Sequence, residues 1–333
     1  MVTYFPVPEE RVGLELDEFL CLLYPGASKG FLRSAIRDGD IEIVGKDALV
    51  ARHLKAQDVI CVHLEEHEIP RQRSTSKIEL NILFEDDRVL VVDKPPGIAV
   101  EPERWDLEAP CVSGLLLDMA ARRSEGGDPA FRPRLVHRID KDTSGALLVA
   151  KDLDAERELR QAFEAHRIQK VYWALVDGEF PAEPGERVRI DLALAPEPKK
   201  VGRMRVVASR GRASQTDVWV EQRFRGFTLV GCAPITGRTH QIRVHLAHEG
   251  FPLAVDPFYG RRDQLLLSEI KAGYRHKQGA SERPLMPRLT LHAHSIAWPR
   301  PGVDGDVFDR AEAPLPKDFA STLKQLAKVR PPA

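Results

Sequence analysis

One carboxylate in this chain has neighbours that suit it to chemistry. Asp140 follows the basic pair His137-Arg138 and precedes a turn of small residues, Thr143-Ser144-Gly145. The apolar run 146–150 comes directly after the turn and is typical of a buried strand. A buried strand fixes the turn beside it, and a fixed turn can hold a reacting group in place. Asp140 is therefore a candidate nucleophile or general base, although an Asp in a turn near a cation is also common on ordinary surfaces.

The chain lacks the sequence patterns that bind common cofactors. No G-x-G-x-x-G follows a strand and no G-x-x-x-x-G-K-[ST] is present, so a nucleotide cofactor is not indicated. Ser144 lies in T-S-G rather than G-x-S-x-G, which argues against a hydrolase elbow. His240, His245 and His248 have neither H-E-x-x-H nor zinc-finger spacing, so structural hydrogen bonding is favoured over metal binding. We expect no cofactor and no metal.

The composition predicts an ordinary soluble protein of about two domains. The chain has 333 residues, of which 43% are hydrophobic and 30% are charged. Its four cysteines are far apart in sequence, which favours reduced thiols. The N-terminus does not resemble a signal peptide, and no apolar run is long enough to cross a bilayer. We expect a cytoplasmic protein that has no membrane partner.

A net charge of −1 conceals one strongly basic zone. Between Pro196 and His245 there are ten Lys and Arg residues but only three acidic ones. Such a zone fits a nucleic-acid partner, and it equally fits a solvated cationic face.

Changes of pattern divide the chain into three segments. Residues 12–64 are predicted to form a small α/β module, 65–77 a polar linker, and 78–328 a larger sheet-rich domain. In the larger domain, short apolar runs predict strands at 82–84, 89–92, 170–178, 216–220 and 226–230. Helical spacing predicts a helix over 153–168, with Leu159, Phe163 and His166 on one stripe, and a last helix near 319–326. An irregular stretch, 261–288, is expected to insert a helix and a loop near the site.

The module has its own helix and strand signals. Apolar spacing predicts a helix over 16–23 that stops at Pro25-Gly26, and Ser28 can cap a second helix that runs to about residue 37. Strands are expected at 41–44 and 59–62. The order resembles the alpha-L RNA-binding domain of ribosomal proteins. The resemblance implies that the cations on one face of the second helix contact an RNA backbone, and these cations are Lys29, Arg33 and Arg37. A merely structural module is the alternative.

Four stretches resemble, in order, the motifs of the RluA-type RNA pseudouridine synthases. The longest match is H-R-I-D-K-D-T-S-G-A-L-L-V-A-K at 137–151, fifteen residues without a gap. The others are D-K-P-P-G at 93–97, K-V-Y-W-A-L-V-D-G at 170–178 and T-G-R-T-H-Q-I-R-V-H at 236–245. The family motif that begins with D-K-P-P-G extends beyond residue 97. Family members usually carry His at the position of Glu101, so this chain departs from the motif there. The resemblance covers essentially the whole chain.

The resemblance implies a fold, a reaction and a set of site residues. The fold would be α+β, with a mixed, mainly antiparallel sheet in the catalytic domain. The catalytic residues would be Asp140, Arg243, which pairs with it, and Tyr172. Leu291 would form an apolar wall, and five polar residues would contact the substrate: His137, Arg138, Thr143, Arg238 and His240.

The reaction would convert uridine to pseudouridine in structured RNA. A glycosidic bond breaks, the uracil rotates and carbon 5 is joined to the ribose, so neither redox chemistry nor a cofactor is required. Asp140 would either add covalently or remove a ribose proton. An adjacent Arg favours its charged form. The base must leave its stack, and Arg138 could fill the vacated space while Tyr172 lies against the flipped ring.

The expected substrate is ribosomal RNA, with transfer RNA as the other candidate, and the enzyme is expected to be a monomer. Two alternatives belong to other classes. One is a non-catalytic RNA-binding protein on the same fold, and the other is a carboxylate-dependent hydrolase that acts on a nucleoside. Intact Asp140, Tyr172 and Arg243 argue against the first, and the basic zone argues against the second.

Overall fold

The structure is a computed structural model that describes residues 2–24, 27–65, 67–69, 78–103, 109–127, 131–183, 185–275, 281–303, 305 and 307–332. The chain forms two compact units. The smaller contains Met1–Glu79 and Glu101–Arg134, and the larger contains Leu80–Val100 and Leu135–Ala333. This grouping differs from the predicted segments 12–64, 65–77 and 78–328, because residues 101–134 group with the N-terminal segment. Most of the predicted linker and the helix stop at Pro25-Gly26 lie outside the described residues.

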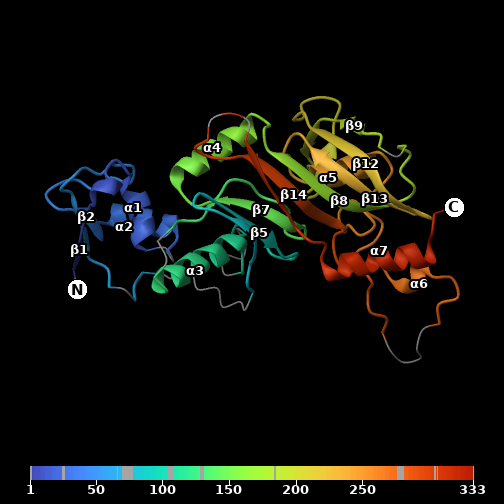
Figure 1. Cartoon of the computed structure of the whole chain (residues 1–333), viewed down its shortest axis with the longest axis horizontal. Coiled ribbons are helices and arrows are strands. Elements are labelled where there is room, and N and C mark those ends of the chain that lie inside the picture. The colour runs from blue at the N-terminus through green and yellow to red at the C-terminus, as the bar shows by residue number, and fades with distance from the viewer. Residues whose placement is uncertain are drawn as a thin grey trace. The chain divides into compact units, whose positions relative to one another are not determined.

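The larger unit is built on a mixed sheet of ten strands (Figure 1). Eight of them follow in the spatial order β4-β5-β7-β14-β8-β13-β12-β9, while β15 pairs with β14 and β6 pairs with β7. Their bounds are β4 (Asn81–Glu85), β5 (Val89–Lys94), β6 (Arg134–Leu135), β7 (Ser144–Ala150), β8 (Gln169–Asp177), β9 (Val188–Asp191), β12 (Gln215–Phe224), β13 (Phe227–Pro234), β14 (Leu291–Pro299) and β15 (Phe308–Glu312). Two further strands, β10 (Leu194–Pro196) and β11 (Met204–Val206), form a separate antiparallel pair.

One strand holds this sheet together. β14 lies between β7, to which it is parallel, and β8, to which it is antiparallel. The other pairs along the main path of the sheet are antiparallel. Every residue of β7 is buried, as expected for a continuous apolar run inside a sheet. The predicted α+β class with a mixed, mainly antiparallel sheet is confirmed.

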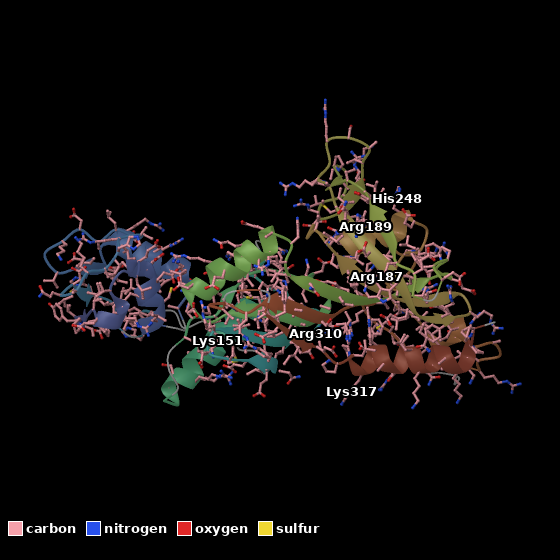
Figure 2. The ribbon with its side chains drawn as sticks, turned by 45° about the horizontal axis from the view of Figure 1, so that its top comes forward. Lys151, Arg187, Arg189, His248, Arg310 and Lys317 are labelled. Atoms are coloured by element: carbon pink, nitrogen blue, oxygen red, sulfur yellow. The ribbon has the colours of Figure 1, made fainter. Side chains whose placement is uncertain are left out.

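Four helices belong to the larger unit: α4 (Leu153–Glu164), α5 (Gln241–His248), α6 (Leu267–Ile270) and α7 (Lys317–Val329). The apolar face of α4 packs on β7 and β14 through Ala155 and Leu159. α5 contributes Ile242 and Leu246 to a second cluster, next to β12 and β13. Figure 2 shows Lys317 at the start of α7 on the lower side of this unit, with Arg187 and His248 on the upper side.

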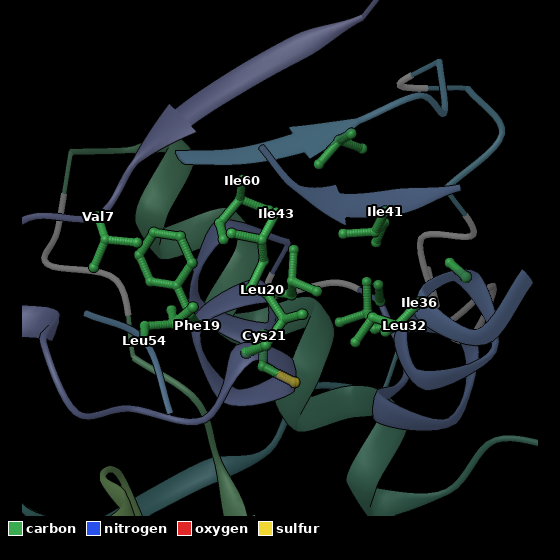
Figure 3. Packing of buried hydrophobic residues seen from close by; sticks show 14 of the residues in the cluster. Val7, Phe19, Leu20, Cys21, Leu32, Ile36, Ile41, Ile43, Leu54 and Ile60 are labelled. Atoms are coloured by element: carbon green, nitrogen blue, oxygen red, sulfur yellow. The ribbon is translucent and has the colours of Figure 1, made fainter. Parts of the chain in front are cut away.

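The smaller unit has its own core (Figure 3). Its elements are β1 (Thr3–Pro6), the short η1 (Glu9–Arg11), α1 (Leu16–Leu23), α2 (Lys29–Asp38), β2 (Ile41–Ile43), β3 (Val59–Val62) and α3 (Val112–Glu125). The strands form an antiparallel sheet in the order β1-β3-β2. Phe19 and Leu20 of α1 meet Leu32 of α2 and Ile60 of β3 in one apolar cluster.

The local signals for α2 act as predicted. The Ser28 side chain accepts a hydrogen bond from the Phe31 backbone N–H at 3.2 Å, which caps the first turn. Gly39 has φ +83° and ends the helix in the left-handed region. The prediction for α4 was wrong at its end, because the helix stops at Glu164 rather than 168. His166 has φ +55° and is exposed, and the Arg167 N–H bonds back to the Ala162 carbonyl in a left-handed helix cap.

Candidate active site

The turn that carries Asp140 is fixed at its C-terminal end. The Thr143 N–H donates to the Asp140 carbonyl at 3.1 Å and closes the turn just before β7. Gly145, the second residue of β7, has φ +113°, and a Cβ there would lie 2.2 Å from the Ala293 carbonyl oxygen of β14. Glycine is therefore required for β14 to approach β7 at this point. The T-S-G sequence thus serves to join two parallel strands beside the carboxylate.

The buried side chain of Lys94 holds the same turn through hydrogen bonds. Lys94, at the end of β5, donates from Nζ to the carbonyl oxygens of Pro95, Ile98 and Lys141, each at 2.8 Å. The Gly97 N–H also donates to the Lys141 carbonyl at 3.0 Å. Burial lowers the pKa of Lys94 to about 7, although the charges of Asp142 and Asp140 oppose this shift. The D-K-P-P-G loop therefore braces the residue that follows Asp140.

Asp140 is held by one of its two carboxylate oxygens. Oδ2 accepts a hydrogen bond from Arg243 Nη1 at 3.0 Å, and His240 Nε2 lies 3.9 Å from the same oxygen. In the described part of the chain Oδ1 has no hydrogen-bond partner. The side chain is 24% exposed. The carboxylate is thus partly buried, paired with a cation, and open to a ligand through its second oxygen.

Arg243 is more firmly bound to another acid than to Asp140. Its Nε and Nη2 donate to the two oxygens of Asp256, each at 2.8 Å, and both side chains are buried. Burial alone would lower the pKa of Arg243, but the hydrogen bonds to Asp256 and the charges of Asp256 and Asp140 raise it above its usual range. The guanidinium also lies against the rings of Phe258 and Tyr259, 5.3 and 5.2 Å from their centroids. It is therefore a fixed cation with one N–H group directed at Asp140.

Sequence analysis did not single out Asp256. The Phe258 N–H and the Tyr259 N–H donate to its Oδ1 at 2.8 and 3.2 Å, so it also organises the turn that follows it. The available signal was an Asp immediately after the apolar run 253–255 and before the turn sequence P-F-Y-G. That pattern indicates a turn, but it does not reveal a partner for Arg243.

Tyr172 and Leu291 lie in the apolar cluster beside the carboxylate. Tyr172, in β8, is opposite Cys232 of β13 and Ala293 of β14. Leu291 is the first residue of β14 and packs in the same cluster as Tyr172. Burial and the nearby charge of Asp140 raise the pKa of the Tyr172 hydroxyl above its usual range. Tyr172 is therefore a neutral phenol at physiological pH. The structure thus places Arg243 and Tyr172 near Asp140, and Leu291 in the same apolar cluster as Tyr172.

The loop 236–240 also approaches the Asp140 carboxylate, through His240. The side chain of Gln241 holds this loop, because its Oε1 accepts from Thr236 Oγ1 at 2.7 Å and from the Arg238 N–H at 3.1 Å. Arg238 is exposed, and its Nε donates to the Ala213 carbonyl at 3.3 Å. His240, the last residue before α5, lies near Asp140, as described above.

The remaining expected substrate contacts differ in their surroundings. His137 accepts the Leu148 N–H at 2.9 Å and stacks on Phe163, with ring centroids 4.9 Å apart. Burial, helped by the Lys170 charge, lowers the pKa of His137 to about 3, so it is a neutral brace between the turn and β7. This geometry gives no support to a substrate contact by His137. Arg138 is exposed, whereas Thr143 is buried and its Oγ1 has no hydrogen-bond partner within the described ranges.

The three histidines of the 236–248 region are not arranged as metal ligands. His245 is buried between Ser214 Oγ at 2.9 Å and Thr216 Oγ1 at 3.0 Å, and burial lowers its pKa to about 4. His248 is exposed on the last turn of α5. Among the residues that the structure describes, no group of three or more His, Cys, Asp or Glu side chains could hold a metal ion. None of the helices within these residues is long and apolar enough to cross a membrane.

Comparison with known proteins identifies the family. Residues 88–248 match the RNA pseudouridylate synthase family. A curated relative, ribosomal large subunit pseudouridine synthase C of Haemophilus ducreyi, is 33% identical over 337 residues, which cover 98% of this chain and 96% of the relative. The chain belongs to the RNA pseudouridylate synthase family. The predicted enzyme class, an RNA pseudouridine synthase, is thereby confirmed.

Two further curated relatives match this chain over similar lengths, and one solved structure matches a shorter part of it. Ribosomal large subunit pseudouridine synthase C of Escherichia coli K12 is 32% identical and covers 97% of this chain and 96% of its own. Ribosomal large subunit pseudouridine synthase D of Nitrosomonas europaea is 32% identical, with 96% of this chain and 86% of the relative covered. Human RNA pseudouridylate synthase domain containing 1 has a similar structure, with a TM-score of 0.51 and 26% identity over 73% of this chain and 87% of its own. The family therefore accounts for the fold as well as for the four motifs.

Proposed function

We propose that this enzyme converts specific uridines of large-subunit ribosomal RNA to pseudouridine, with Asp140 as the reacting carboxylate. The observation that carries the proposal is the hydrogen bond from Arg243 to only one of the two Asp140 oxygens, Oδ2. It pairs a partly buried carboxylate with a cation and leaves Oδ1 without a hydrogen-bond partner among the described residues. The three curated bacterial relatives named above are ribosomal large subunit pseudouridine synthases, which supports ribosomal RNA over transfer RNA.

The side chains around Asp140 suit the isomerisation. The bond between ribose carbon 1 and uracil nitrogen 1 breaks, and a bond to uracil carbon 5 forms. The proton on carbon 5 is lost to solvent and nitrogen 1 gains one, so the reaction is balanced without a cofactor. Asp140 acts either by adding to the substrate or by removing a ribose proton. The neutral ring of Tyr172 and the side chain of Leu291 offer an apolar surface for the flipped base.

Exposed cations in the larger unit are suited to the RNA backbone. Seven of the ten basic residues between 196 and 245 are exposed: Lys199, Lys200, Arg205, Arg210, Arg212, Arg225 and Arg238. Two others have internal roles, since Arg243 is buried in the site and Arg223 donates to the carbonyls of Phe180 and Ala182. Arg138, which is also exposed, is the side chain we assign to the space that the flipped base leaves.

The N-terminal module is proposed to be an alpha-L-like RNA-binding domain with a smaller cationic face than its sequence suggests. Of the three cations on α2, Lys29 pairs with Glu18 and with Asp17, and Arg33 donates to Asp17 at 2.7 Å. Asp17 and Glu18 are buried. Arg37 is exposed at the end of the helix and is the cation best placed to meet a phosphate. The enzyme is also proposed to be a monomer and to act in the cytoplasm.

Two measurements test the function. Purified enzyme should release tritium from ribosomal RNA labelled at uridine carbon 5, and pseudouridine mapping in cells with and without the gene should identify the position. Free uracil as the product would indicate a hydrolase instead. Binding of RNA without any tritium release would indicate a non-catalytic protein.

A further inference from the structure

His240 bridges Asp140 and a tyrosine with its two ring nitrogens. Nε2 lies 3.9 Å from Asp140 Oδ2, and Nδ1 lies 2.9 Å from the hydroxyl of Tyr259. The two rings meet edge to face, with centroids 5.6 Å apart. The chemistry proposed above assigns no role to Tyr259 and only a general substrate contact to His240.

The neighbours of the Tyr259 hydroxyl determine which nitrogen of His240 carries the proton. The Met204 N–H donates to the Tyr259 oxygen at 2.7 Å, so the oxygen is an acceptor on that side. In the described part of the chain the only acceptor for the phenol proton is His240 Nδ1. A neutral imidazole has one N–H group, which must then be on Nε2 and face Asp140. The opposite tautomer would direct a lone pair at a carboxylate and leave the phenol proton without an acceptor.

His240 is also neutral and held in an uncommon conformation. Burial lowers its pKa, as do the charges of Arg243 and Arg138, although Asp140 and Asp256 oppose this shift. Its backbone φ is +54°, in the left-handed region that few residues other than glycine occupy. Such conformations persist where the surrounding structure imposes them, and they cluster at functional sites.

We propose that His240 is a positioning residue whose Nε2–H group, in the tautomer fixed by Tyr259, joins Arg243 in holding Asp140 Oδ2, so that Oδ1 is the oxygen that reacts. A separation of 3.9 Å is about 1 Å longer than a hydrogen bond. The proposal therefore requires this contact to shorten when RNA fills the site, as catalytic hydrogen bonds often do. This inference rests on the proposed role of Asp140 and adds the choice of its reacting oxygen.

Two substitutions at His240 separate this role from a structural one. The amide nitrogen of His240→Gln reaches about where Nε2 lies, whereas that of His240→Asn reaches about where Nδ1 lies. Left-handed backbone is tolerated better by Asn than by Gln, so stability alone favours His240→Asn. The proposal predicts the reverse order for the single-turnover rate at saturating RNA. His240→Gln should stay within about tenfold of the natural enzyme, and His240→Asn should fall by about 10²-fold, as for loss of one stabilising donor. The KM for RNA should change little in either variant.

A third variant tests the tautomer directly. Tyr259→Phe removes the hydroxyl group that donates to His240 Nδ1, but it leaves the aromatic ring beside Arg243. The ¹⁵N spectrum of histidine-labelled natural enzyme should show His240 protonated on Nε2, and Tyr259→Phe should show a mixture of tautomers with a slower single-turnover rate. These measurements hold even if a His240 variant fails to fold.

Some results would overturn the inference. One is a rate for His240→Asn equal to or above that for His240→Gln, and another is a proton on Nδ1 in the natural enzyme. Asp140→Asn distinguishes this failure from failure of the proposed function. If that variant is inactive while His240→Asn is fully active, only the role of His240 is wrong. If Asp140→Asn is active, the role of Asp140 is wrong.

Discussion

Asp256 binds the guanidinium of Arg243 through two hydrogen bonds of 2.8 Å, and this pair determines where the Nη1 group of Arg243 points. Asp140 receives that group at 3.0 Å. Since Asp256 is itself fixed by two backbone N–H groups, the position of Oδ2 is set by a chain of contacts that begins in the turn 256–260.

Asp140→Asn should abolish pseudouridine formation and leave the fold intact. The amide has nearly the same shape as the carboxylate but lacks its charge, so neither addition nor proton removal remains efficient. Tritium release should fall to background, while RNA affinity and the melting temperature stay close to those of the natural enzyme. Appreciable turnover by this variant would remove Asp140 from the mechanism.

Arg243→Met should reduce both stability and activity, and activity more. It leaves Asp256 buried without its cation, and loss of one partner of a buried pair costs about 3–5 kcal/mol. Urea unfolding measures the loss of stability, and tritium release at a temperature where the variant is folded measures the loss of activity. Arg243→Lys is the control, because it keeps the charge but cannot bind Asp256 with two parallel hydrogen bonds. If Arg243→Met were as active as the natural enzyme, the pairing would have no catalytic role.

Asp256→Asn should lower the rate of the chemical step without changing RNA affinity. The amide keeps one acceptor for Arg243 but breaks the two-bond geometry, so the guanidinium is less well directed at Asp140. A misplacement of about 1 Å can reduce a rate by about 10²-fold. Single-turnover kinetics at saturating RNA separates this effect from binding. A variant that changes only KM would show that Asp256 acts on RNA binding instead.

Stability should fall in acid because buried histidines must remain neutral. His292 is buried between Ser144 Oγ at 3.0 Å and the Ala313 carbonyl at 3.2 Å, and burial lowers its pKa from 6.5 to about 4. Between these values the unfolded chain binds more protons than the folded protein, so stability rises with pH. The contribution is complete above pH 6.5, is lost as pH falls towards 4, and amounts to roughly 3 kcal/mol.

The free energy of unfolding in urea, measured from pH 7 to pH 4, tests this behaviour. His292→Gln cannot titrate and should show a flatter dependence than the natural enzyme. His248→Gln is the matched control, because His248 is exposed. The explanation fails if His292→Gln and the natural enzyme lose stability in parallel.

In the N-terminal module, Lys29→Gln should affect stability, whereas Arg37→Gln should affect RNA binding. Burial alone would raise the pKa of Glu18, but hydrogen bonds from Arg134 and Lys29 lower it to about 2. Lys29→Gln therefore removes a partner from a buried acid and should lower the free energy of unfolding by about 1–3 kcal/mol. Arg37→Gln should instead weaken RNA binding and reduce the slope of log affinity against log salt by roughly 0.7–0.9.

Filter binding of a long RNA over a range of salt concentrations measures these slopes. Lys317→Gln, at an exposed position of α7, serves as the control for a cation outside the module. Equal slopes for Arg37→Gln and the natural enzyme would mean that α2 does not contact phosphates.

Residue patterns predicted most elements, and the family resemblance implied the pair of Asp140 with Arg243. Neither revealed the contacts that depend on the third dimension. α1 and α2 were predicted because their caps and apolar spacing are local. α3 was missed, since Gly114 interrupts an otherwise helical stretch. The position of β14 was also missed. The order of strands in a sheet depends on pairing between segments far apart in sequence, so no single segment reveals it. Asp256 was not predicted, because only the folded chain reveals its bonds to Arg243.

The place of β14 in the sheet has a consequence for the newly made enzyme. A ribosome must produce residues 1–290 before this strand begins to emerge, and until then β4-β5-β7 and β8-β13-β12-β9 have no strand between them. Asp140 leads into the first group, and Tyr172 belongs to the second. A nascent or truncated chain that ends before Leu291 therefore carries every reacting group but no assembled site. Activity should therefore begin only once β14 has inserted between these two groups of strands.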